Sequence, residues 1–357
     1  MANATGTVIE VSDLVKIYGG ETRAVDQVSF DVGRGELFGF LGPNGAGKTT
    51  TIRILATLLK PTSGAARVAG YDVVGDAGEV RKRLGLAMQT PTLDAFSTGR
   101  ETLELAGRLH RMPKREIRRR TDELLQLMGL ETAAKKLTGQ YSGGMKRRLD
   151  LAAALMHQPE VLILDEPTEG LDPQSRTALW EELERINAEG TTMLLTTHYM
   201  EEADRLCTRL AIIDNGHVVV EGRPETLKAG VGADTVVLQL GQGGREASPS
   251  AVQRGSATAE AGHDGNEAGE EARREEFCRL LEGMVACEAV AAHEGSVTLS
   301  VPDASAAIPA LLRRLDGSGL DISGLQMSRP SLDDVFMNYT GRHIREEAAD
   351  QPIILGF

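Results

Sequence analysis

A glycine-rich segment, Gly42–Thr49, constrains the fold of this chain more than any other sequence feature. Its sequence, GPNGAGKT, fits the pattern G-x-x-x-x-G-K-[ST] and lies between an apolar run, Glu36–Leu41, and a helical pattern over Thr49–Leu59. Glycines let the backbone wrap tightly with its N–H groups pointing inward, and the following helix adds its positive N-terminal end. Lys48 can reach outer phosphates, and the hydroxyl of Thr49 can bind Mg²⁺. The segment therefore predicts a phosphate-binding loop between a strand and a helix.

Strand-like and helix-like segments alternate around this loop over residues 36–213. Residues 161–166 and 191–198 are apolar runs that end in polar residues, which is typical of buried parallel strands. Residues 97–156 have mainly helical patterns, and residues 8–32 have the alternation of half-buried strands. This order predicts an α/β domain with a central parallel sheet.

Local signals place several element ends. Thr98 and Glu101 form a capping-box pair that opens one helix, and Gly129 is expected to close the next. A third helix is expected to begin near Gly144 and to end before Pro159. The pair Asn215-Gly216 predicts a two-residue hairpin between two strands. The second of these helices has an apolar stripe of Ile117, Leu124, Leu125 and Met128.

Asp165 and Glu166 end the predicted strand over residues 161–166. Ligands bind beyond the carboxyl ends of parallel strands, so these carboxylates are expected at the same edge as Lys48 and Thr49. Asp165 is expected to complete a Mg²⁺ site, and Glu166 to orient or deprotonate an attacking water. A solvated turn is the alternative interpretation of an Asp-Glu pair taken alone.

A second glycine-rich segment, Ser142-Gly143-Gly144, directly precedes the third helix. One interpretation is structural: Ser142 caps the helix, and the glycines only form a turn. The other interpretation is functional. The chain has two anion-binding segments but one set of carboxylates, so the second segment is expected to contact a nucleotide held by another chain.

The chain carries 39 Lys and Arg against 52 Asp and Glu among 357 residues, for a net charge of −13. This balance argues against non-specific nucleic-acid binding, which requires a basic surface, and we expect no nucleic-acid partner. The apolar runs are far shorter than a membrane span, and the N-terminus lacks the features of a secretory signal. Three cysteines, Cys207, Cys278 and Cys287, are expected to be free thiols in a reducing, cytoplasmic compartment.

The C-terminal third differs in composition from the rest. Residues 241–272 contain almost no large aliphatic side chain and are expected to form a disordered loop. Around them, residues 235–240 and SVTLSV predict strands, whereas residues near Phe277 and IPALLRRL predict helices. The expected division is a nucleotide-binding domain over residues 1–232, a small α+β domain over residues 233–340 that the loop interrupts, and a tail over residues 341–357.

The motifs together resemble a known family. GPNGAGKTT, Gln89, YSGGM, LILDEP, GLDP and His198 occur in the order and approximate spacing of ATP-binding-cassette (ABC) ATPases, and the resemblance spans about residues 8–230. It implies a P-loop NTPase fold with a parallel core sheet, an antiparallel β subdomain and an α-helical subdomain. YSGGMKRRLDLAAAL, LLTTHYMEEAD and RPSLDDVFMNYTG are similar to the daunorubicin-resistance group of drug-export ATPase subunits.

The resemblance implies a role for each matched position. Tyr18 corresponds to the aromatic residue that stacks on adenine, and Gln89 to a residue that touches Mg²⁺ and senses a membrane partner. Asp172 corresponds to the residue that communicates across a dimer, and His198 to a switch that contacts the γ-phosphate. Ser142, Gly143 and Gly144 then face the γ-phosphate on the opposite subunit. The remaining nucleotide-binding positions are Gly42, Pro43, Asn44, Gly45, Ala46, Gly47, Lys48, Thr49 and Thr50.

The second glycine-rich motif departs from the commonest family signature, LSGGQ, at both ends. Tyr141 stands for the usual Leu and Met145 for the usual Gln, whereas the Ser-Gly-Gly centre is intact. Contact with phosphate is therefore expected to survive, and the role of the usual Gln is open.

The resemblance implies an ATPase subunit with Lys48, Glu166 and His198 as catalytic residues, and Thr49, Gln89 and Asp165 around Mg²⁺. Two copies are expected to close head to tail around ATP and Mg²⁺ and to power a separate permease that exports a drug-like or lipid-like molecule. The subunit is expected at the cytoplasmic face of the cell membrane as a peripheral protein. The alternatives are a soluble ABC ATPase in translation or DNA repair, and a non-catalytic ATP-binding regulator.

A basic run follows Pro113 and has two interpretations. Its five cations are either the solvated face of an amphipathic helix or a surface that attracts anionic lipid headgroups. The run comprises Lys114, Arg115, Arg118, Arg119 and Arg120. The apolar end of the chain, residues 352–357, is interpreted as a docking tail, an ordered edge or a frayed end.

Overall fold

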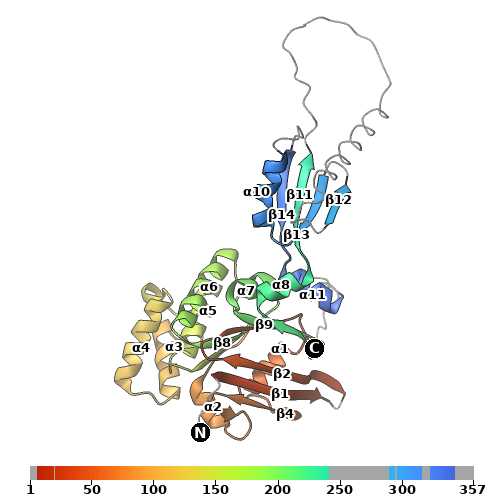
Figure 1. Ribbon diagram of the computed structural model, residues 1–357. Helices are drawn as coiled ribbons and strands as arrows, with labels where there is room; N and C mark the ends of the chain where they lie inside the picture. Colours follow the sequence, from red (N-terminus) through yellow and green to blue (C-terminus); the bar gives the residue numbers. More distant parts are fainter. Residues whose placement is uncertain (1–5, 20, 241–288, 294–295, 316–321, 342–357) are drawn as a thin grey trace, which may run out of the picture. The chain divides into compact units, whose positions relative to one another are not determined.

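The computed structural model describes residues 6–19, 21–240, 289–293, 296–315 and 322–341 (Figure 1). The chain divides into two units: the first comprises residues 1–227 and 332–357, and the second residues 228–331. This division differs from the domains expected over residues 1–232 and 233–340, because the segment from Leu332 onward belongs to the first unit. The expected loop over residues 241–272, the helix near Phe277 and the apolar tail lie outside the described residues.

A six-stranded sheet forms the centre of the first unit, in the order β10-β9-β3-β8-β7-β6. Four neighbouring pairs of strands are parallel and β10 pairs antiparallel with β9, so the predicted central parallel sheet is confirmed. β3, β7 and β8 are buried along their whole length, which explains their continuous apolar sequences. The strands are β3 (Leu37–Leu41), β6 (Leu84–Ala87), β7 (Val161–Asp165), β8 (Thr192–Thr197), β9 (Arg209–Asp214) and β10 (His217–Gly222).

The register of this sheet brings three strand ends together. Leu41 at the end of β3 is paired with Thr197 of β8, and Asp165 at the end of β7 is paired with Thr196. Because the three strands are parallel, the segments that follow them leave the sheet at the same edge. The glycine-rich loop, Glu166 and His198 therefore meet there.

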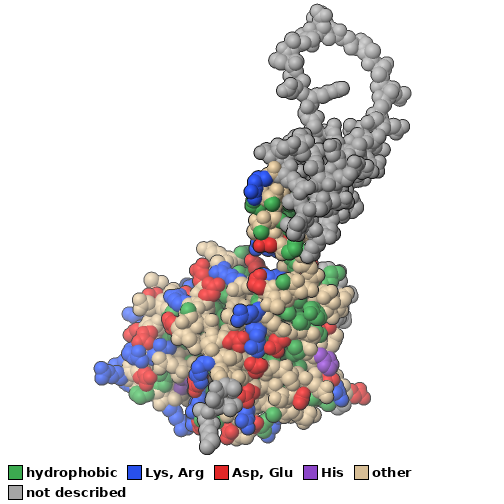
Figure 2. Space-filling model, in the orientation of Figure 1, with side chains coloured by type: hydrophobic (Ala, Val, Ile, Leu, Met, Phe, Trp, Pro, Cys, Tyr) green, Lys and Arg blue, Asp and Glu red, His purple; other side chains and the backbone are tan. Residues whose placement is uncertain are grey.

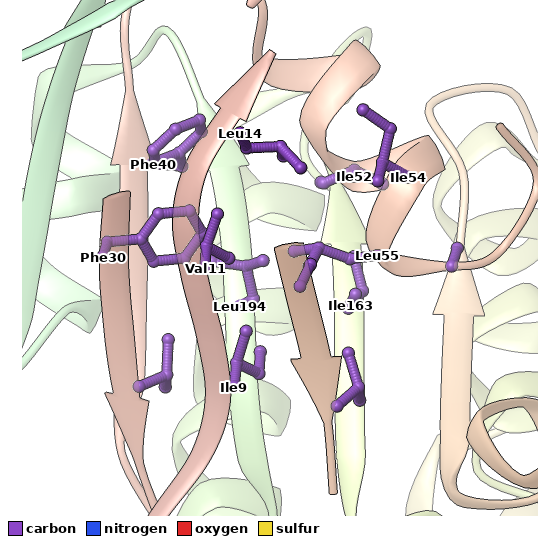
Figure 3. Packing of buried hydrophobic residues seen from close by; sticks show 14 of the residues in the cluster. Ile9, Val11, Leu14, Phe30, Phe40, Ile52, Ile54, Leu55, Ile163 and Leu194 are labelled. Carbon is purple, nitrogen blue, oxygen red and sulfur yellow. The ribbon is translucent and has the colours of Figure 1, made fainter. Parts of the chain in front are cut away.

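An antiparallel sheet packs on the central sheet together with helix α1 (Lys48–Leu55). Its order is β2-β1-β4-β5, and its members are β1 (Thr7–Tyr18), β2 (Thr22–Gly33), β4 (Ser63–Val68) and β5 (Tyr71–Asp72). Figure 3 shows part of their shared core, in which Phe30 of β2 lies beside Phe40 of β3; their ring centroids are 5.2 Å apart. Helix α1 ends at Leu55, earlier than the helix expected to reach Leu59.

The helical part contains α3 (Gly99–Leu109), α4 (Lys114–Leu127) and α5 (Gly143–Ala154). The predicted capping box of Thr98 and Glu101 is confirmed, and Gly129 follows α4 with a left-handed φ of 61°. The remaining helices of the first unit are α2 (Ala77–Arg83), η1 (Glu131–Ala133), η2 (Thr138–Gln140), α6 (Pro173–Ala188), α7 (Met200–Leu206) and α11 (Leu332–Thr340). Helix α8 (Pro224–Val231) spans the boundary between the two units.

The second unit has one antiparallel sheet in the order β12-β13-β11-β14 and one described helix, α10 (Ala304–Leu315). Val236 and Leu238 of β11, Leu299 of β13 and Leu311 of α10 are fully buried and form its described interior. The small α+β unit is thus confirmed. Its strands are β11 (Asp234–Leu240), β12 (Ala289–His293), β13 (Ser296–Val301) and β14 (Ile322–Ser328).

Helix α11 returns the chain to the first unit, where it contacts α7 and β10. Leu332, Val335 and Phe336 lie on one helical face and are almost completely buried. The sequence RPSLDDVF thus contributes to the packing of the first unit. Within the described part of the chain, none of the helices combines the length and the apolar character needed to cross a bilayer.

Candidate active site

The glycine-rich loop folds as predicted at the end of β3. Gly45 and Gly47 have φ values of 83° and 104°, which glycine adopts without strain. The loop is also tightly enclosed, because a Cβ atom at Gly42 would lie 2.2 Å from the carbonyl oxygen of Ile213. Helix α1 begins at Lys48, so its unsatisfied N-terminal N–H groups border the loop. The segment therefore has the geometry of an anion-binding loop.

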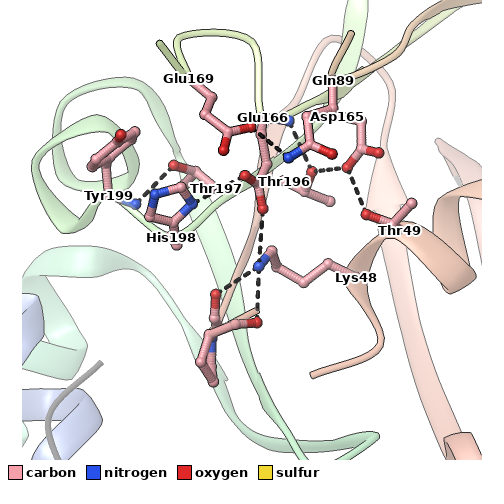
Figure 4. A network of polar contacts seen from close by, with 12 residues as sticks. Lys48, Thr49, Gln89, Asp165, Glu166, Glu169, Thr196, Thr197, His198 and Tyr199 are labelled. Carbon is pink, nitrogen blue, oxygen red and sulfur yellow. Dashed lines mark hydrogen bonds and ion pairs between the residues drawn. The ribbon is translucent and has the colours of Figure 1, made fainter. Parts of the chain in front are cut away.

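Lys48 is buried at the centre of the site, with 4% of the residue exposed. Its Nζ atom donates to the carbonyl oxygens of Gly42 (2.7 Å) and Pro43 (3.0 Å) and lies 3.2 Å from Oε1 of Glu166 (Figure 4). Burial lowers the pKa of Lys48, although the carboxylates of Glu166 and Asp165 oppose this shift. These contacts hold the ammonium group beside the loop that is expected to receive phosphates.

The buried carboxylate of Asp165 joins α1 to β8. Its Oδ1 atom accepts hydrogen bonds from the hydroxyl groups of Thr49 (3.2 Å) and Thr196 (2.7 Å). Its Oδ2 atom is also buried but has no hydrogen-bond partner in the described structure. A free carboxylate oxygen beside a threonine hydroxyl is the kind of hard oxygen donor set that Mg²⁺ prefers. Asp165 and Thr49 therefore fit the predicted metal site.

Glu166 lies between Lys48 and His198 and has an unusual backbone conformation. Its φ of 45° is left-handed, which is uncommon for a residue with a side chain. The backbone N–H of Glu166 donates to the carbonyl and hydroxyl oxygens of Thr196, both at 3.1 Å. These bonds turn the residue off β7 so that its carboxylate, 6% exposed, faces the other site groups.

The carboxylate of Glu166 stays ionised although it is buried. Burial raises its pKa, but the hydrogen bond with His198 and the charge of Lys48 outweigh burial and hold the pKa below its usual range. The Nδ1 atom of His198 is 3.1 Å from Oε2 of Glu166, and the ring of His198 contacts the ring of Tyr199 at a centroid distance of 4.1 Å. A base that is ionised, buried and oriented on both oxygens is thus assembled.

Gln89 is connected to this site through a hydrogen bond with Glu169. Its side-chain amide donates to Oε2 of Glu169, which lies in the segment that follows Glu166. The structure thus brings Gln89 to the same edge of the sheet (Figure 4). Its contact with Mg²⁺ stays a prediction, as does the stacking of Tyr18, a residue that is 40% exposed at the end of β1.

Ser142, Gly143 and Gly144 lie on a different part of the first unit. No hydrogen bond or ion pair of the described residues joins them to Lys48, Glu166 or His198. The hydroxyl oxygen of Ser142 accepts the Met145 N–H at 3.3 Å and caps α5, so the N-cap interpretation describes its contacts within the chain. Asp172 likewise caps α6 by accepting the Ser175 N–H at 3.0 Å. Their roles toward a second subunit stay predictions.

Tyr141, the first departure from the common signature, has a structural place. The residue is buried, and its hydroxyl donates to the carbonyl oxygen of Ala133 at 2.7 Å. Space for this hydroxyl exists because Gly99 has no side chain: a Cβ atom there would lie 2.2 Å from it. The side chain of Tyr141 therefore binds the helical part together, beneath the exposed Ser142.

We expect Tyr141→Phe to lower the free energy of unfolding by about 1 kcal/mol, because it removes the hydroxyl hydrogen bond to the carbonyl oxygen of Ala133, which then keeps only the Lys136 N–H as a donor. Urea unfolding measures this change, and ATP turnover should stay within about twofold because the substitution leaves Ser142 in place. A large loss of turnover without a loss of stability would contradict the structural role.

Several residues of the site were not predicted from the sequence. Thr196 occupies an apolar strand run, and Glu169 lies in a turn, so neither stood out among similar residues. Arg147 belongs to a basic helical run of the kind that is usually solvated, yet it is buried beside Asp165. Only contacts between distant segments identify these three residues.

The other basic run, at the start of α4, is divided between two environments. Arg119 and Arg120 pair with Glu123, and Arg120 also donates to the carbonyl oxygen of Leu155. Lys114, Arg115 and Arg118 are exposed, and Figure 2 shows basic side chains gathered where Figure 1 places α4. The solvated-face interpretation fits the four exposed cations, whereas Arg120 is partly buried. The attraction to lipid headgroups stays a prediction.

The chain matches two family descriptions. Residues 25–169 match the ABC transporter family, and residues 274–340 match the C-terminal domain of DrrA1-3-like ATP-binding proteins. The first match includes the glycine-rich loop, the Ser-Gly-Gly segment and Asp165. The second match ends at the last residue of α11.

Curated relatives are similar over nearly the whole chain. The daunorubicin resistance ATP-binding protein DrrA3 of Streptomyces coeruleorubidus is 40% identical over 346 residues, which is 96% of this chain and 99% of the relative. The daunorubicin/doxorubicin resistance ATP-binding protein DrrA of Streptomyces peucetius is 39% identical and covers 96% of both chains. The linearmycin resistance ATP-binding protein LnrL of Bacillus subtilis is 33% identical, over 95% of this chain and all of the relative.

Solved structures resemble the first part of the chain. The cbiO1 subunit of a Clostridium perfringens ABC transporter complex has a TM-score of 0.59 and 30% identity, over 63% of this chain and 91% of that one. A dimeric ATP-binding cassette in a post-hydrolysis state with ADP and phosphate has a TM-score of 0.56 and 28% identity, over 60% of this chain and 98% of that one.

Proposed function

The chain belongs to the ATP-binding proteins of the ABC transporter family, and from this we propose that it is the ATP-hydrolysing subunit of a drug exporter. Relatives over the whole chain are named for resistance to daunorubicin, doxorubicin or linearmycin, which supports export of a bulky, drug-like molecule. The single observation that carries the enzymatic part is the placement of the ionised Glu166 between Lys48 and His198.

The site residues suit hydrolysis at a γ-phosphate. The loop over residues 42–50 binds the phosphates through backbone N–H groups, and Lys48 neutralises the outer ones. Glu166 orients the attacking water and accepts its proton, while His198 keeps Glu166 in place and contacts the γ-phosphate. Thr49 and Asp165, with Gln89 nearby, would hold Mg²⁺, which would supply positive charge to offset the negative charge of the phosphates. Tyr18 stacks on the adenine ring.

A second copy completes the pocket in this proposal. Ser142–Gly144 are accessible at the N-terminus of α5, where free N–H groups favour an anion. With Asp172 they face the nucleotide on the partner in a head-to-tail homodimer. Support comes from the similar cassette that was solved as a dimer with ADP and phosphate. Closing the dimer desolvates the phosphates and strengthens each contact with them.

Transport itself requires a separate membrane permease in this proposal. Phe96 is 86% exposed in the segment between Gln89 and α3, and Leu105 and Leu109 are exposed four residues apart on α3. These exposed apolar side chains, in the segment that follows Gln89 and on α3, give a permease a surface to bind. The subunit then lies at the cytoplasmic face of the membrane as a peripheral protein.

Inverted membrane vesicles test the proposal. We expect vesicles that contain this chain and a co-expressed permease partner to accumulate doxorubicin, read by fluorescence quenching, only with Mg-ATP. Vesicles with Glu166→Gln or without the permease should show none. Turnover of ATP without accumulation of any tested drug would reject drug export and leave the ATPase assignment. Absence of phosphate release by purified protein and by complex would favour the non-catalytic regulator.

A further inference from the structure

The guanidinium group of Arg147 bonds to three backbone carbonyls from two other segments. Its Nε atom donates to Pro167 O at 2.7 Å, Nη2 donates to Asp165 O at 3.0 Å, and Nη1 donates to Met88 O. Arg147 itself lies on α5, and only 4% of the residue is exposed. A single side chain thus connects α5 with the end of β6 and the end of β7.

The three carbonyls belong to the catalytic part of the chain. Met88 directly precedes Gln89, and Asp165 and Pro167 flank Glu166. Arg147 therefore fixes the backbone on both sides of the expected base and next to the expected sensor of the permease. None of these bonds involves a side chain that is expected to touch nucleotide, so the contribution of Arg147 is to position.

The N-terminus of α5, about one turn before Arg147, carries Ser142–Gly144. Arg147 lies within the second turn of this helix, close enough that its anchor limits how the N-terminus can move. A shift of Ser142–Gly144 toward or away from a neighbouring chain is then either resisted by the three bonds or passed on to the backbone around Glu166.

Burying this charge is costly, which argues against simple filling of space. Burial lowers the pKa of Arg147, and the nearest carboxylate, Asp150, is 3.5 Å away and only partly compensates. Burial also raises the pKa of Asp150 to about 6, despite the charge of Arg147. An apolar side chain would fill the same volume without this desolvation cost. The planar fork of an arginine is suited to several acceptors in different directions.

We propose that Arg147 is a positioning residue that couples Ser142–Gly144, facing one nucleotide of the dimer, to Glu166 and Gln89, which serve the other nucleotide. The proposal rests on the shared-site dimer described above. Closure of one shared nucleotide site thereby determines the backbone position of Glu166, the base of the second site.

Arg147→Lys and Arg147→Met test the proposal, with Arg148→Lys and Arg148→Met as matched controls. Arg148 is the next residue of α5 and also donates to a backbone carbonyl, that of Met128, within the helical part. Both Arg147 variants should keep ATP affinity within about threefold. Their turnover number should fall about 10- to 100-fold, because small misplacements of reacting groups are costly. The controls should keep turnover within about threefold.

Mixed dimers separate coupling from a local effect. One chain carries Lys48→Ala, so only the loop of the other chain can work, and Arg147→Lys is placed in either chain in turn. Coupling predicts a lower turnover number from both placements, with unchanged ATP affinity of the working loop. If the turnover number falls only when Arg147→Lys lies in the chain whose Glu166 serves the working loop, the coupling is disproved. Wild-type turnover in both mixtures would overturn any positioning role.

Two measurements keep these outcomes interpretable. Circular dichroism and the melting temperature of each variant identify misfolding, and Arg147→Lys retains charge and length should Arg147→Met fail to fold. The mixture of Lys48→Ala and otherwise unchanged chains reports whether shared sites exist. If that mixture shows no dimer with Mg-ATP, the shared-site proposal fails before Arg147 is tested.

Discussion

Glu166→Gln is expected to lower ATP turnover by about 10²- to 10⁴-fold, the range that a general base contributes. Glutamine has the same shape, so the left-handed backbone and the bonds to Thr196 can persist. It carries no charge, however, and cannot accept the proton of the attacking water. Phosphate release with Mg-ATP measures the loss.

The same variant should keep ATP and remain dimeric. Glutamine no longer attracts the ammonium group of Lys48, which lies 3.2 Å from the carboxylate in the wild-type chain. Lys48 is then free to serve the phosphates, and without hydrolysis nothing separates the subunits. Gel filtration with Mg-ATP should show the dimer mass, whereas Glu181→Gln, at an exposed position of α6, should behave as wild type. A monomeric Glu166→Gln protein with full activity would disprove the assigned role.

Mixing two inactive variants is expected to restore activity. Lys48→Ala removes the cation of one loop, and Ser142→Arg blocks the surface that covers the loop of the other subunit. In a mixed dimer, the intact loop of the Ser142→Arg chain meets the intact Ser142 of the Lys48→Ala chain. Random pairing then gives about a quarter of the wild-type number of complete sites.

The measurement is phosphate release across a series of mixing ratios. Activity should be highest at equal amounts and absent from either variant alone, because only mixed dimers hold a complete site. Differently tagged chains show that mixed dimers form. No recovery despite such dimers would mean that each subunit holds its own complete pocket.

The positions of the proposed catalytic residues were predictable because these residues lie at strand ends. Lys48, Asp165, Glu166 and His198 each come after an apolar run, and parallel strands place the ends of such runs at one edge. The pairing of Leu41 with Thr197 and of Asp165 with Thr196 confirms this reasoning. The resemblance to ABC ATPases then added roles that spacing alone does not assign.

Other features depended on contacts that no local pattern records. Helix α11 was expected with the small second domain, but its apolar face packs against α7 and β10 of the first unit. Tyr141 replaced a leucine in a familiar motif, and only its bond to Ala133 across the helical part shows why a hydroxyl is accommodated there.

The amino-acid sequence by itself determined the phosphate-binding loop, the alternation of strands and helices, and the carboxylates at the strand ends, because backbone conformation and periodicity are local properties. Tertiary structure alone decided the neighbours of each side chain. Arg147 looks like any surface cation of a helix, yet the fold brings it the carbonyls of Met88, 59 residues away, and Pro167, 20 residues away. A side chain is buried or solvated according to what distant segments place around it, and that information is not contained in its own surroundings along the chain.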